Sequence, residues 1–510
     1  MALRLNKDRK IIQKKIWWKM NLEEYFLKFR KEIIGIDQEF NSPYGKKKIV
    51  YADWIASGRL YHPIEKKLLN NFYPFTGNTH SESSETGSMM TQAYNQAKQI
   101  IKKHVNADEK DVIIFSGYGM TSAINKFQRI LGLHYPEQLR QYISIPPSAK
   151  PVVFVTHMEH HSNHTSWLET ICDVVIIGID EQGRVNLDRL EVLLELNYER
   201  KYKIGSFTAA SNVTGIATQY YKMAKLMHKY GGICLIDFAA SAPYVDINMH
   251  SENPEEKLDG IFFSPHKFLG GPGTPGIMVF DSALYKRKVP DNPGGGTVDW
   301  TNPWGKHKYI DDIELREDGG TPGFLQAIKA ALAIKLKEEM GVKNILAREE
   351  ELCKIAFDKL KMIPTLHLLD QEQEKQLGIF SFYVEDVHYN LMVKLLSDRY
   401  GIQMRGGCSC AGTYGHYLLH VDPTRSKSIT DKIDQGDLSE KPGWVRFSLH
   451  PTMTNEELDY ILSAIDEVII NHKTWSKDYE YSPKTNEFYH YTLKGNEYSQ
   501  VHDLFKKVEN

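Results

Sequence analysis

Several features are scarce in this chain of 510 residues, and each scarcity narrows the class of protein. The five cysteines are an odd number and too few for a disulfide framework, so we expect a reducing, cytoplasmic setting. No apolar run reaches the roughly 20 residues that span a bilayer. The 63 basic and 65 acidic residues nearly cancel, giving a formal net charge of -2. We therefore expect neither a membrane protein nor one that binds nucleic acid through a global charge.

The first 19 residues are basic but lack both serine and an apolar run long enough for a signal peptide. A solvated basic helix is the simpler interpretation, and an amphipathic presequence is the alternative.

Short apolar runs alternate with amphipathic segments from about Lys48 to Asp281. This alternation is typical of stacked βα units around a mostly parallel sheet with helices on both faces. One helix is expected at Tyr221–Tyr230, before the stop signal of Gly231. The predicted strands are Val112–Phe115, Val152–Val155, Val174–Ile177, Ile233–Ile236, Ile261–Phe263 and Ile277–Phe280.

The pattern changes after about Thr321 and predicts a smaller α+β domain. We therefore divide the chain into an N-terminal segment (1–50) that packs with the small domain, a large domain (51–324), a small domain (325–474) and a C-terminal extension (475–510). Polar residues from Pro423 to Lys441 predict an exposed loop. The helices expected in the small domain are Gly323–Met340, Glu349–Lys361 and Asn455–Ile470, and its strands are Ile379–Val384 and Trp444–Leu449.

The sharpest local signal is Ser264-Pro-His-Lys-Phe-Leu-Gly-Gly-Pro-Gly-Thr-Pro-Gly276, directly after the apolar Gly260–Phe263. Burial and neighbouring cations would lower the pKa of Lys267 and make its amine nucleophilic toward an aldehyde. An ordinary loop lysine is an equally good interpretation of this segment alone. A P-loop is excluded, because Lys267 precedes the glycines.

Two more motifs stand where predicted strands end. Residues 113–124 predict a strand, a glycine turn at Gly119 and a helix start, whose free N–H groups bind phosphate well. A simple βα turn is the alternative. Asp237 ends the apolar Ile233–Asp237, where a buried carboxylate needs a partner such as a pyridinium nitrogen. A helix N-cap is the alternative for Asp237.

Four histidines cluster in His157-Met-Glu-His-His-Ser-Asn-His164 and raise the question of zinc. No second ligand cluster with metal spacing accompanies them, and Cys408-Ser-Cys410 alone is a poor closed site. We expect no metal.

The order of these motifs resembles the class V aminotransferase family, and within it the cysteine desulfurase/selenocysteine lyase group. The ordered set is a glycine turn, Glu-His-His, Ser-Asn-Val-x-Gly, strand-Asp, Ser-x-His-Lys, Gly-Gly-Gly-Thr, Gly-Thr-Pro and Arg-x-Gly-x-x-Cys. The resemblance covers roughly residues 50–470. It implies the pyridoxal 5′-phosphate (PLP)-dependent fold type I, an α/β architecture.

The resemblance also implies a cofactor site. Lys267 would hold PLP covalently as a Schiff base, Asp237 would keep the pyridine nitrogen protonated, and His160 would stack on the ring and move protons. A homodimer is implied as well, with loops of the second subunit completing the phosphate site. The phosphate residues would be Met120, Thr121, Ser264 and His266, joined by Gly296, Thr297 and Thr321 of the dimer loops.

For the substrate, the resemblance assigns Asn212 and Arg446 to its carboxylate, since an arginine fork binds carboxylate bidentately. A surface strand residue is the alternative for Arg446. Cys410, rather than Cys408, matches the catalytic cysteine, which would take sulfur or selenium as a persulfide, release alanine, and pass the sulfur to an acceptor protein. A free thiol has a pKa of about 8.5, so the site must lower it or use His160 as a proton partner.

One departure weakens the desulfurase interpretation. Ala240 stands where the group has a glutamine that bonds to the cofactor's phenolic oxygen, and a water, Ser241 or Asn212 would have to substitute. Two alternatives stay open. One is another class V enzyme (an aminotransferase, an epimerase or a kynureninase-like carbon–carbon lyase) in which Cys410 is incidental, and the other is a low-activity paralogue.

Overall fold

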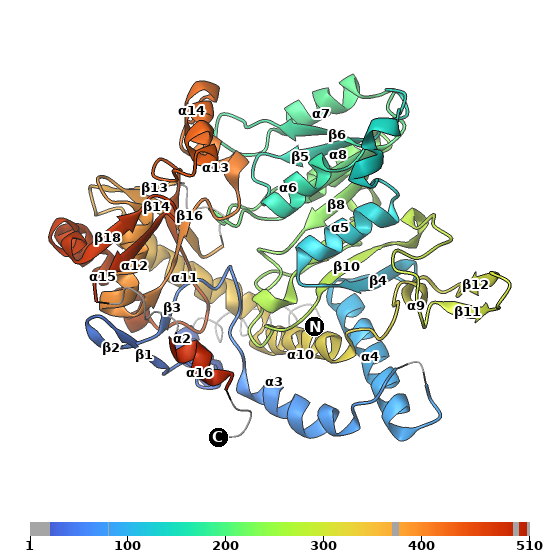
Figure 1. The fold of residues 1–510 in the computed structure, drawn as a ribbon, viewed down its shortest axis with the longest axis horizontal. Helices are drawn as coiled ribbons and strands as arrows, with labels where there is room; N and C mark the ends of the chain where they lie inside the picture. The colour runs from blue at the N-terminus through green and yellow to red at the C-terminus, as the bar shows by residue number, and fades with distance from the viewer. Residues whose placement is uncertain (1–20, 80, 370–376, 493–498, 507–510) are drawn as a thin grey trace, which may run out of the picture.

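A seven-stranded sheet forms the centre of the larger part of the molecule, in a computed structural model that describes residues 21–79, 81–369, 377–492 and 499–506. Its strand order is β4-β10-β9-β8-β7-β5-β6, and β10 alone runs antiparallel to its neighbours. The predicted α/β architecture with a mostly parallel sheet is confirmed (Figure 1). The strands are β4 (Asp111–Ser116), β5 (Val152–Thr156), β6 (Asp173–Ile177), β7 (Lys203–Thr208), β8 (Ile233–Asp237), β9 (Gly260–Phe263) and β10 (Gly276–Asp281).

Side chains from both faces of this sheet are buried. Ile113, Ile261 and Ile277 belong to one core, whereas their immediate neighbours, among them Ile114 and Phe262, belong to a second core with helix α5. Successive side chains of a strand point to opposite faces, so helices must cover both. The helices of this part are α3 (His62–Lys67), α4 (Glu85–His104), α5 (Met120–Ile130), α6 (His161–Leu168), α7 (Leu187–Leu196), α8 (Tyr220–Lys229) and α9 (Ile313–Arg316).

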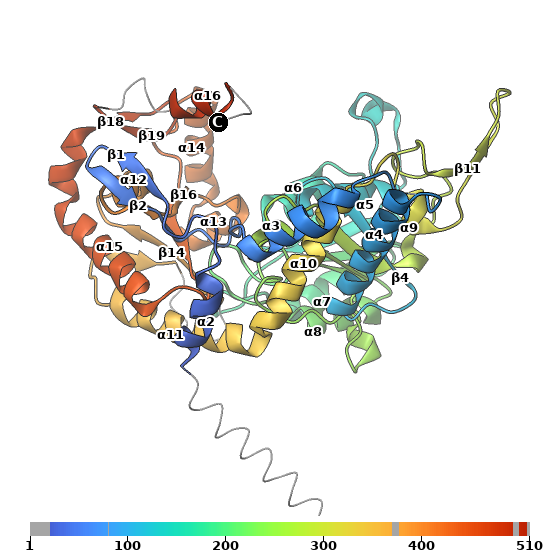
Figure 2. The same ribbon diagram turned by 90° about the horizontal axis from the view of Figure 1, so that it is seen from below.

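The smaller part is built on a four-stranded sheet of order β13-β14-β17-β16. Helix α10 (Phe324–Met340) lies between the two parts and packs on α4 (Figure 2). The N-terminal α2 (Leu22–Arg30) packs on α11, and Arg30 pairs with Glu457 of α15 at 2.7 Å. The strands are β13 (Leu366–Leu368), β14 (Ile379–Val384), β15 (Ile402–Gln403), β16 (Arg405–Gly407) and β17 (Trp444–Ser448), and the helices are α11 (Val342–Leu360), α12 (Tyr389–Tyr400), α13 (Gly412–Leu418), α14 (Pro423–Asp434) and α15 (Asn455–Trp475).

The segment Pro423–Lys441 differs from its prediction as an exposed loop. Most of it is helix α14, which begins after Asp422, whose carboxylate caps the N–H groups of Thr424 and Arg425. Ile429, one helical turn from Ile433, is buried. The sequence signals were a capping aspartate and a proline at the first helical position, which both favour a helix start.

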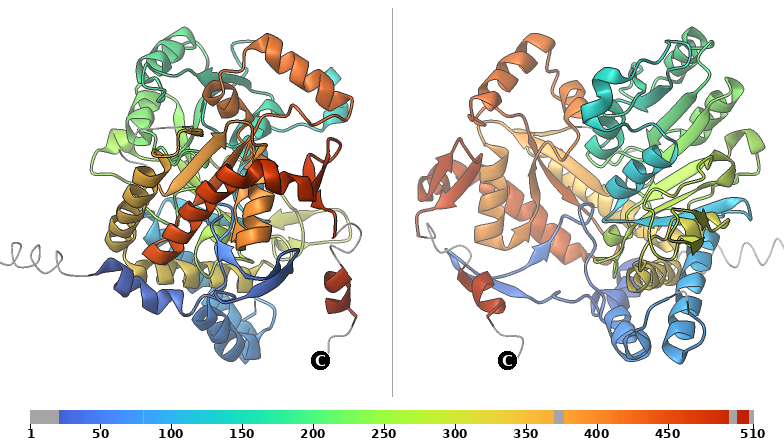
Figure 3. Two further views of the ribbon diagram at one scale, coloured as in Figure 1. Left: turned by 90° about the vertical axis from the view of Figure 1, so that its left-hand side faces the viewer. Right: turned by 45° about the vertical axis from the view of Figure 1, so that its right-hand side comes forward.

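The described part of the C-terminal extension is a hairpin of β18 (Tyr479–Ser482) and β19 (Glu487–His490), followed by α16 (Ser499–Leu504). Leu438 N donates to Pro483 O at 2.9 Å, so the hairpin supports the segment that carries α14. Both lie at the periphery of the smaller part (Figure 3).

Three short strand pairings complete the fold, two of them antiparallel and one parallel. A hairpin of β11 (Val298–Thr301) and β12 (His307–Tyr309) projects from the larger part (Figure 2). β1 (Glu39–Ser42) pairs with β2 (Gly45–Lys48), and β3 (Val50–Tyr51) pairs with β15. No helix in the described ranges is long and apolar enough to cross a membrane. The basic segment of residues 1–19 lies outside those ranges.

Candidate active site

A cavity of about 250 Å³ opens at the carboxyl ends of β7, β8 and β9. In parallel α/β sheets, ligands bind at this edge because the strand ends and helix starts converge there. The structure brings together ten of the predicted site residues in the lining of this one cavity. They are Met120, Thr121, His160, Asn212, Asp237, Ser264, His266, Lys267, Cys410 and Arg446.

Lys267 reaches the cavity from a single turn, Pro265–Lys267, that follows β9. Burial lowers the pKa of its amine to about 8, and the charge of Asp237 partly offsets that effect. An amine with a pKa near 8 is partly neutral at physiological pH and can attack an aldehyde. An ordinary solvated loop lysine does not fit this environment.

Asp237 is buried at the last position of β8, and its Oδ1 accepts a hydrogen bond from Ala239 N at 2.8 Å. Burial raises the pKa of this carboxyl to about 6, while the Ala239 N–H and Lys267 oppose the rise. No helix starts after Asp237, so the helix N-cap alternative is wrong. A cationic partner in the cavity, such as a pyridinium N–H, would restore its ionised form.

The part of the cavity lining at the start of α5 suits an anion. Gly119 has φ +79° and precedes the first turn of α5, and Met120 N donates to Ser264 Oγ at 2.8 Å. A Cβ on Gly119 would lie 3.1 Å from Ser264 Oγ and 3.3 Å from His266 Nε2. The absence of that carbon leaves room for a phosphate beside the helix N-terminus.

His160 is held in one protonation state. Its Nδ1 accepts from Ser162 N at 3.1 Å, and burial, followed by the charge of Lys267, lowers its pKa to about 3. The ring is therefore neutral near pH 7. Since Nδ1 accepts, the single ring proton is on Nε2, where the imidazole can donate.

Arg446 is buried in the middle of the small sheet, so the surface-strand alternative is wrong. Its Nη2 donates to Asp53 Oδ1 at 2.8 Å, and its Nη1 donates to Asn212 O at 3.1 Å. Arg405 is its cross-strand partner on β16 and also lines the cavity. Two guanidiniums here favour a carboxylate ligand. Asp53 was not predicted as a site residue. Its position after a short apolar strand was the one signal for it in the sequence.

The two cysteines of the Cys-Ser-Cys loop face different spaces. Cys410 lines the cavity of Lys267, whereas Cys408 lines a second, mostly apolar cavity of about 210 Å³ between α13 and α14. Ser409 and Cys410 have φ +52° and +57°, in the left-handed region. Such residues cost roughly 1–3 kcal/mol each and persist only where surrounding contacts fix them.

Asn212 is one of the contacts that fix this loop. Its Nδ2 donates to Ser409 O at 2.8 Å, which leaves one N–H for a ligand. Its buried Oδ1 has no partner among the described residues. The hydroxyl of Ser241 is also buried and without a described partner, but Ser241 does not line the cavity. Of the two side chains considered as substitutes for the glutamine missing at Ala240, only Asn212 lines the cavity, and its one remaining N–H serves either the cofactor's phenolic oxygen or the substrate carboxylate.

Three predicted phosphate residues lie outside the cavity lining of this chain. Thr297 Oγ1 donates to Gly294 O at 2.7 Å, and Thr321 Oγ1 contacts Asn78 Oδ1 at 3.4 Å. Gly296 belongs to the same loop as Thr297, before β11. Their assignment to a partner's site stays a prediction.

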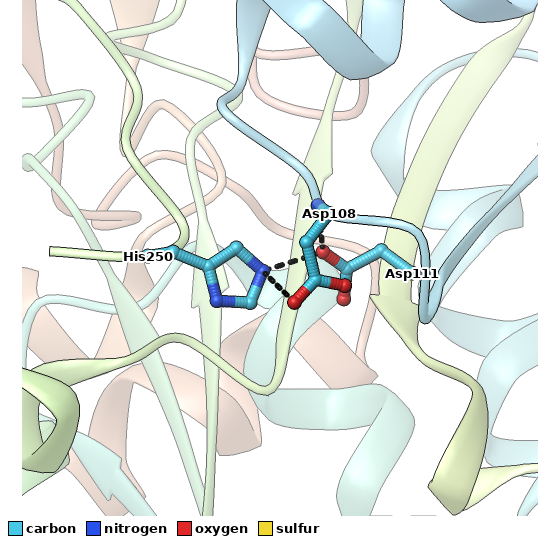
Figure 4. Close-up of side chains that lie close together, drawn as sticks. All are labelled: Asp108, Asp111 and His250. Atoms are coloured by element: carbon cyan, nitrogen blue, oxygen red, sulfur yellow. Dashed lines mark hydrogen bonds and ion pairs between the residues drawn. The ribbon is translucent and has the colours of Figure 1, made fainter.

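The His157–His164 cluster forms no group of three metal-ligating atoms within the described ranges. Such a group does occur at Asp108, Asp111 and His250, at the start of β4 and thus at the other end of that strand from the cavity (Figure 4). His250 Nε2 lies 2.6 Å from Asp111 Oδ2, and Asp111 also accepts from Asp108 N at 2.8 Å. These contacts account for the arrangement as a histidine–aspartate hydrogen bond beside a capped turn.

Known structures share this fold. The structure matches the apo cysteine desulfurase of Thermococcus onnurineus with a TM-score of 0.68 and 21% identity, covering 87% of this chain and 98% of that one. It matches the cysteine desulfurase CsdA of Escherichia coli, in an S-sulfonic acid form, with a TM-score of 0.68, 22% identity and the same coverage. At these low sequence identities, the two structural matches establish the shared fold alone.

Sequence comparison places the chain in a family. The fold is that of the fold type I enzymes, and a lysine, an aspartate and the start of α5 surround one cavity in it. The family model described as Aminotransferase class-V matches residues 50–461. Probable cysteine desulfurases of Halalkalibacterium halodurans and Staphylococcus aureus are 27% and 26% identical over 380 residues, covering 74% of this chain and 86% and 85% of those proteins. The chain belongs to the class-V aminotransferase family.

Enzymes of this family use PLP, and the cavity fits that cofactor. A cationic partner would stabilise the ionised form of the buried Asp237, the amine of Lys267 has a lowered pKa, and Gly119 leaves space at the start of α5. These three features match the pyridine nitrogen, the aldehyde and the phosphate of PLP, respectively.

Proposed function

We propose that this chain is a PLP-dependent enzyme that removes sulfur from L-cysteine, or selenium from selenocysteine, releasing L-alanine and keeping the sulfur as a persulfide on Cys410. The observation that carries the proposal is that Cys410 lines the same cavity as Lys267, Asp237 and Arg446. The names of the relatives in the sequence comparison support the same activity.

The residues of the cavity have separate tasks. Lys267 would hold PLP covalently, with Asp237 at its ring nitrogen, His160 over its ring, and Met120, Thr121, Ser264 and His266 at its phosphate. When bound, PLP draws electrons from the substrate's Cα and so loosens its bonds. Arg446 and the free N–H of Asn212 would orient the substrate carboxylate.

Sulfur transfer then depends on Cys410. Its thiolate attacks the substrate sulfur, a new S–S bond forms, and the C–S bond breaks with its electron pair left on the carbon. That carbon gains a proton and becomes the methyl group of the alanine that is released. The balance is cysteine plus a Cys410 thiol, giving alanine plus a Cys410 persulfide. The neutral His160 and Lys267 are the nearby groups able to move these protons.

We extend the proposal to a homodimer in which Gly296, Thr297 and Thr321 reach the partner's phosphate site, and to a sulfur-acceptor protein. The five free cysteines support a cytoplasmic location, because thiols stay reduced there.

The test is to incubate the purified, PLP-loaded protein with cysteine and a panel of other amino acids and to quantify the products. Alanine formed in equal amount to the sulfide released under a thiol reductant supports the proposal. A keto acid, a D-amino acid or a carbon–carbon cleavage product would assign the chain to another activity of its family. Bound PLP without turnover would indicate an inactive paralogue.

A further inference from the structure

We infer that His161 is a positioning residue that holds the cysteine loop in place with Cys410 at the cavity. The inference rests on the proposed function and adds to it what fixes the nucleophile. Ser409 and Cys410 both adopt left-handed backbone conformations, which non-glycine residues rarely keep without support. A loop of this shape needs contacts on both sides of Cys410.

His161 supplies contacts through its main chain and its side chain. Its backbone N donates to Cys410 O at 2.8 Å, and its Nε2 accepts from Gly412 N at 2.9 Å. The two contacts fix the peptide groups on either side of Ala411, which is buried. A Cβ on Gly412 would lie 3.1 Å from His161 Nε2, so a glycine permits this close approach.

The imidazole must be neutral to accept this hydrogen bond, with its proton on Nδ1. Burial, followed by the charge of Lys441, lowers the pKa of His161 and so favours the neutral form.

Asn212 holds the strained loop on the N-terminal side of Cys410, through Ser409 O, whereas two further contacts support the neighbouring helix. His164 Nδ1 lies 3.1 Å from Thr413 Oγ1, and Thr214 Oγ1 lies 3.2 Å from Tyr414 OH. Those contacts fix α13. Without His161, the backbone at Cys410 would relax toward ordinary conformations and the thiol would move away from the cavity.

The test uses the full chain with Cys408→Ser as background, so that Cys410 is the thiol labelled in the tryptic peptide Gly406–Arg425. The alkylation rate of Cys410 by iodoacetamide is measured in apoenzyme and PLP-loaded enzyme, beside alanine formation from cysteine. His161→Phe keeps a ring but loses the acceptor. His161→Gln places an amide oxygen near the position of Nε2. His367→Phe, at a half-buried site on β13 outside the cavity lining, is the matched control.

We expect His161→Phe to alkylate faster in both forms and to make alanine about 100-fold more slowly, because a displaced nucleophile loses its alignment. We expect its visible PLP absorbance to be unchanged. His161→Gln should recover most of both properties, and His367→Phe should match the background. The inference would be overturned if His161→Phe showed the alkylation rate and the turnover of the Cys408→Ser background, or if His161→Gln behaved like His161→Phe.

If His161→Phe does not fold, His161→Asn replaces it, since its shorter amide cannot reach Gly412 N. Absence of alanine with the wild type would refute the proposed function, and the alkylation rates would still decide the role of His161.

Discussion

Asp53 and Arg446, 393 positions apart in the chain, form a 2.8 Å ion pair between Oδ1 and Nη2 beside the cavity. The side chain of Arg446 is 3% exposed and that of Asp53 is 17% exposed. A charge this buried is costly unless it is paired. The pair therefore keeps a guanidinium in the site, with other N–H groups left for a ligand.

Asp53→Ala should lower the free energy of unfolding by about 3 kcal/mol, because it leaves the buried charge of Arg446 without its carboxylate. Asp53→Asn keeps an acceptor oxygen and should lose less. Thermal denaturation of the apoenzyme measures both variants. Equal stability of Asp53→Ala and the wild type would show that this pair contributes nothing to the fold.

The rate at which apoenzyme takes up PLP should follow the neutral fraction of Lys267. Because its pKa is about 8, that fraction rises with pH and levels off above pH 8. For an ordinary lysine, the neutral fraction would keep rising up to about pH 10.5. Asp237→Asn should move the midpoint lower, since the Asp237 charge raises this pKa. Absorbance after stopped-flow mixing follows the reaction.

Lys267→Ala is the control for that experiment and should form no borohydride-reducible link to PLP. Covalent trapping in this variant would move the assignment to another lysine.

Arg446→Lys should reduce kcat/KM for cysteine by about 10- to 100-fold, as expected when a charge-assisted bidentate contact worth about 1.5–3 kcal/mol is lost. A lysine keeps the charge but not the planar fork. Steady-state kinetics of alanine formation measure the change. Unchanged kinetics for every amino acid that the enzyme accepts would exclude Arg446 from substrate binding.

Cys410→Ser should bind PLP and cysteine but make almost no alanine, because a hydroxyl is a far poorer nucleophile than a thiolate near neutral pH. Cys408→Ser should have a much smaller effect, since Cys408 faces the second cavity. Cysteine is the proper substrate for this comparison, as selenium chemistry can partly bypass the thiol. Alanine at the wild-type rate from Cys410→Ser would leave Cys410 incidental and favour another activity of the family.

Sequence alone predicted the elements that depend on local order. Lys267, Asp237 and the turn at Gly119 were found because each lies at or shortly after the end of an apolar strand, and parallel strands bring their carboxyl ends to one edge. Six of the seven central strands were predicted from continuous apolar runs. β7 was missed, because its Lys203, Ser206 and Thr208 interrupt the apolar pattern although all six of its residues are buried.

Tertiary structure decided what depends on pairing between distant segments. No local pattern links Asp53 to Arg446, because their contact follows from the register of β17 and the return of the N-terminal segment to the small sheet. The helix α14 buries Ile429, and such tertiary burial, which stabilises most helices in proteins, is concealed by the polar composition of the segment. The left-handed backbone of Cys410 likewise exists only where the folded chain supplies His161 and Asn212 to hold it.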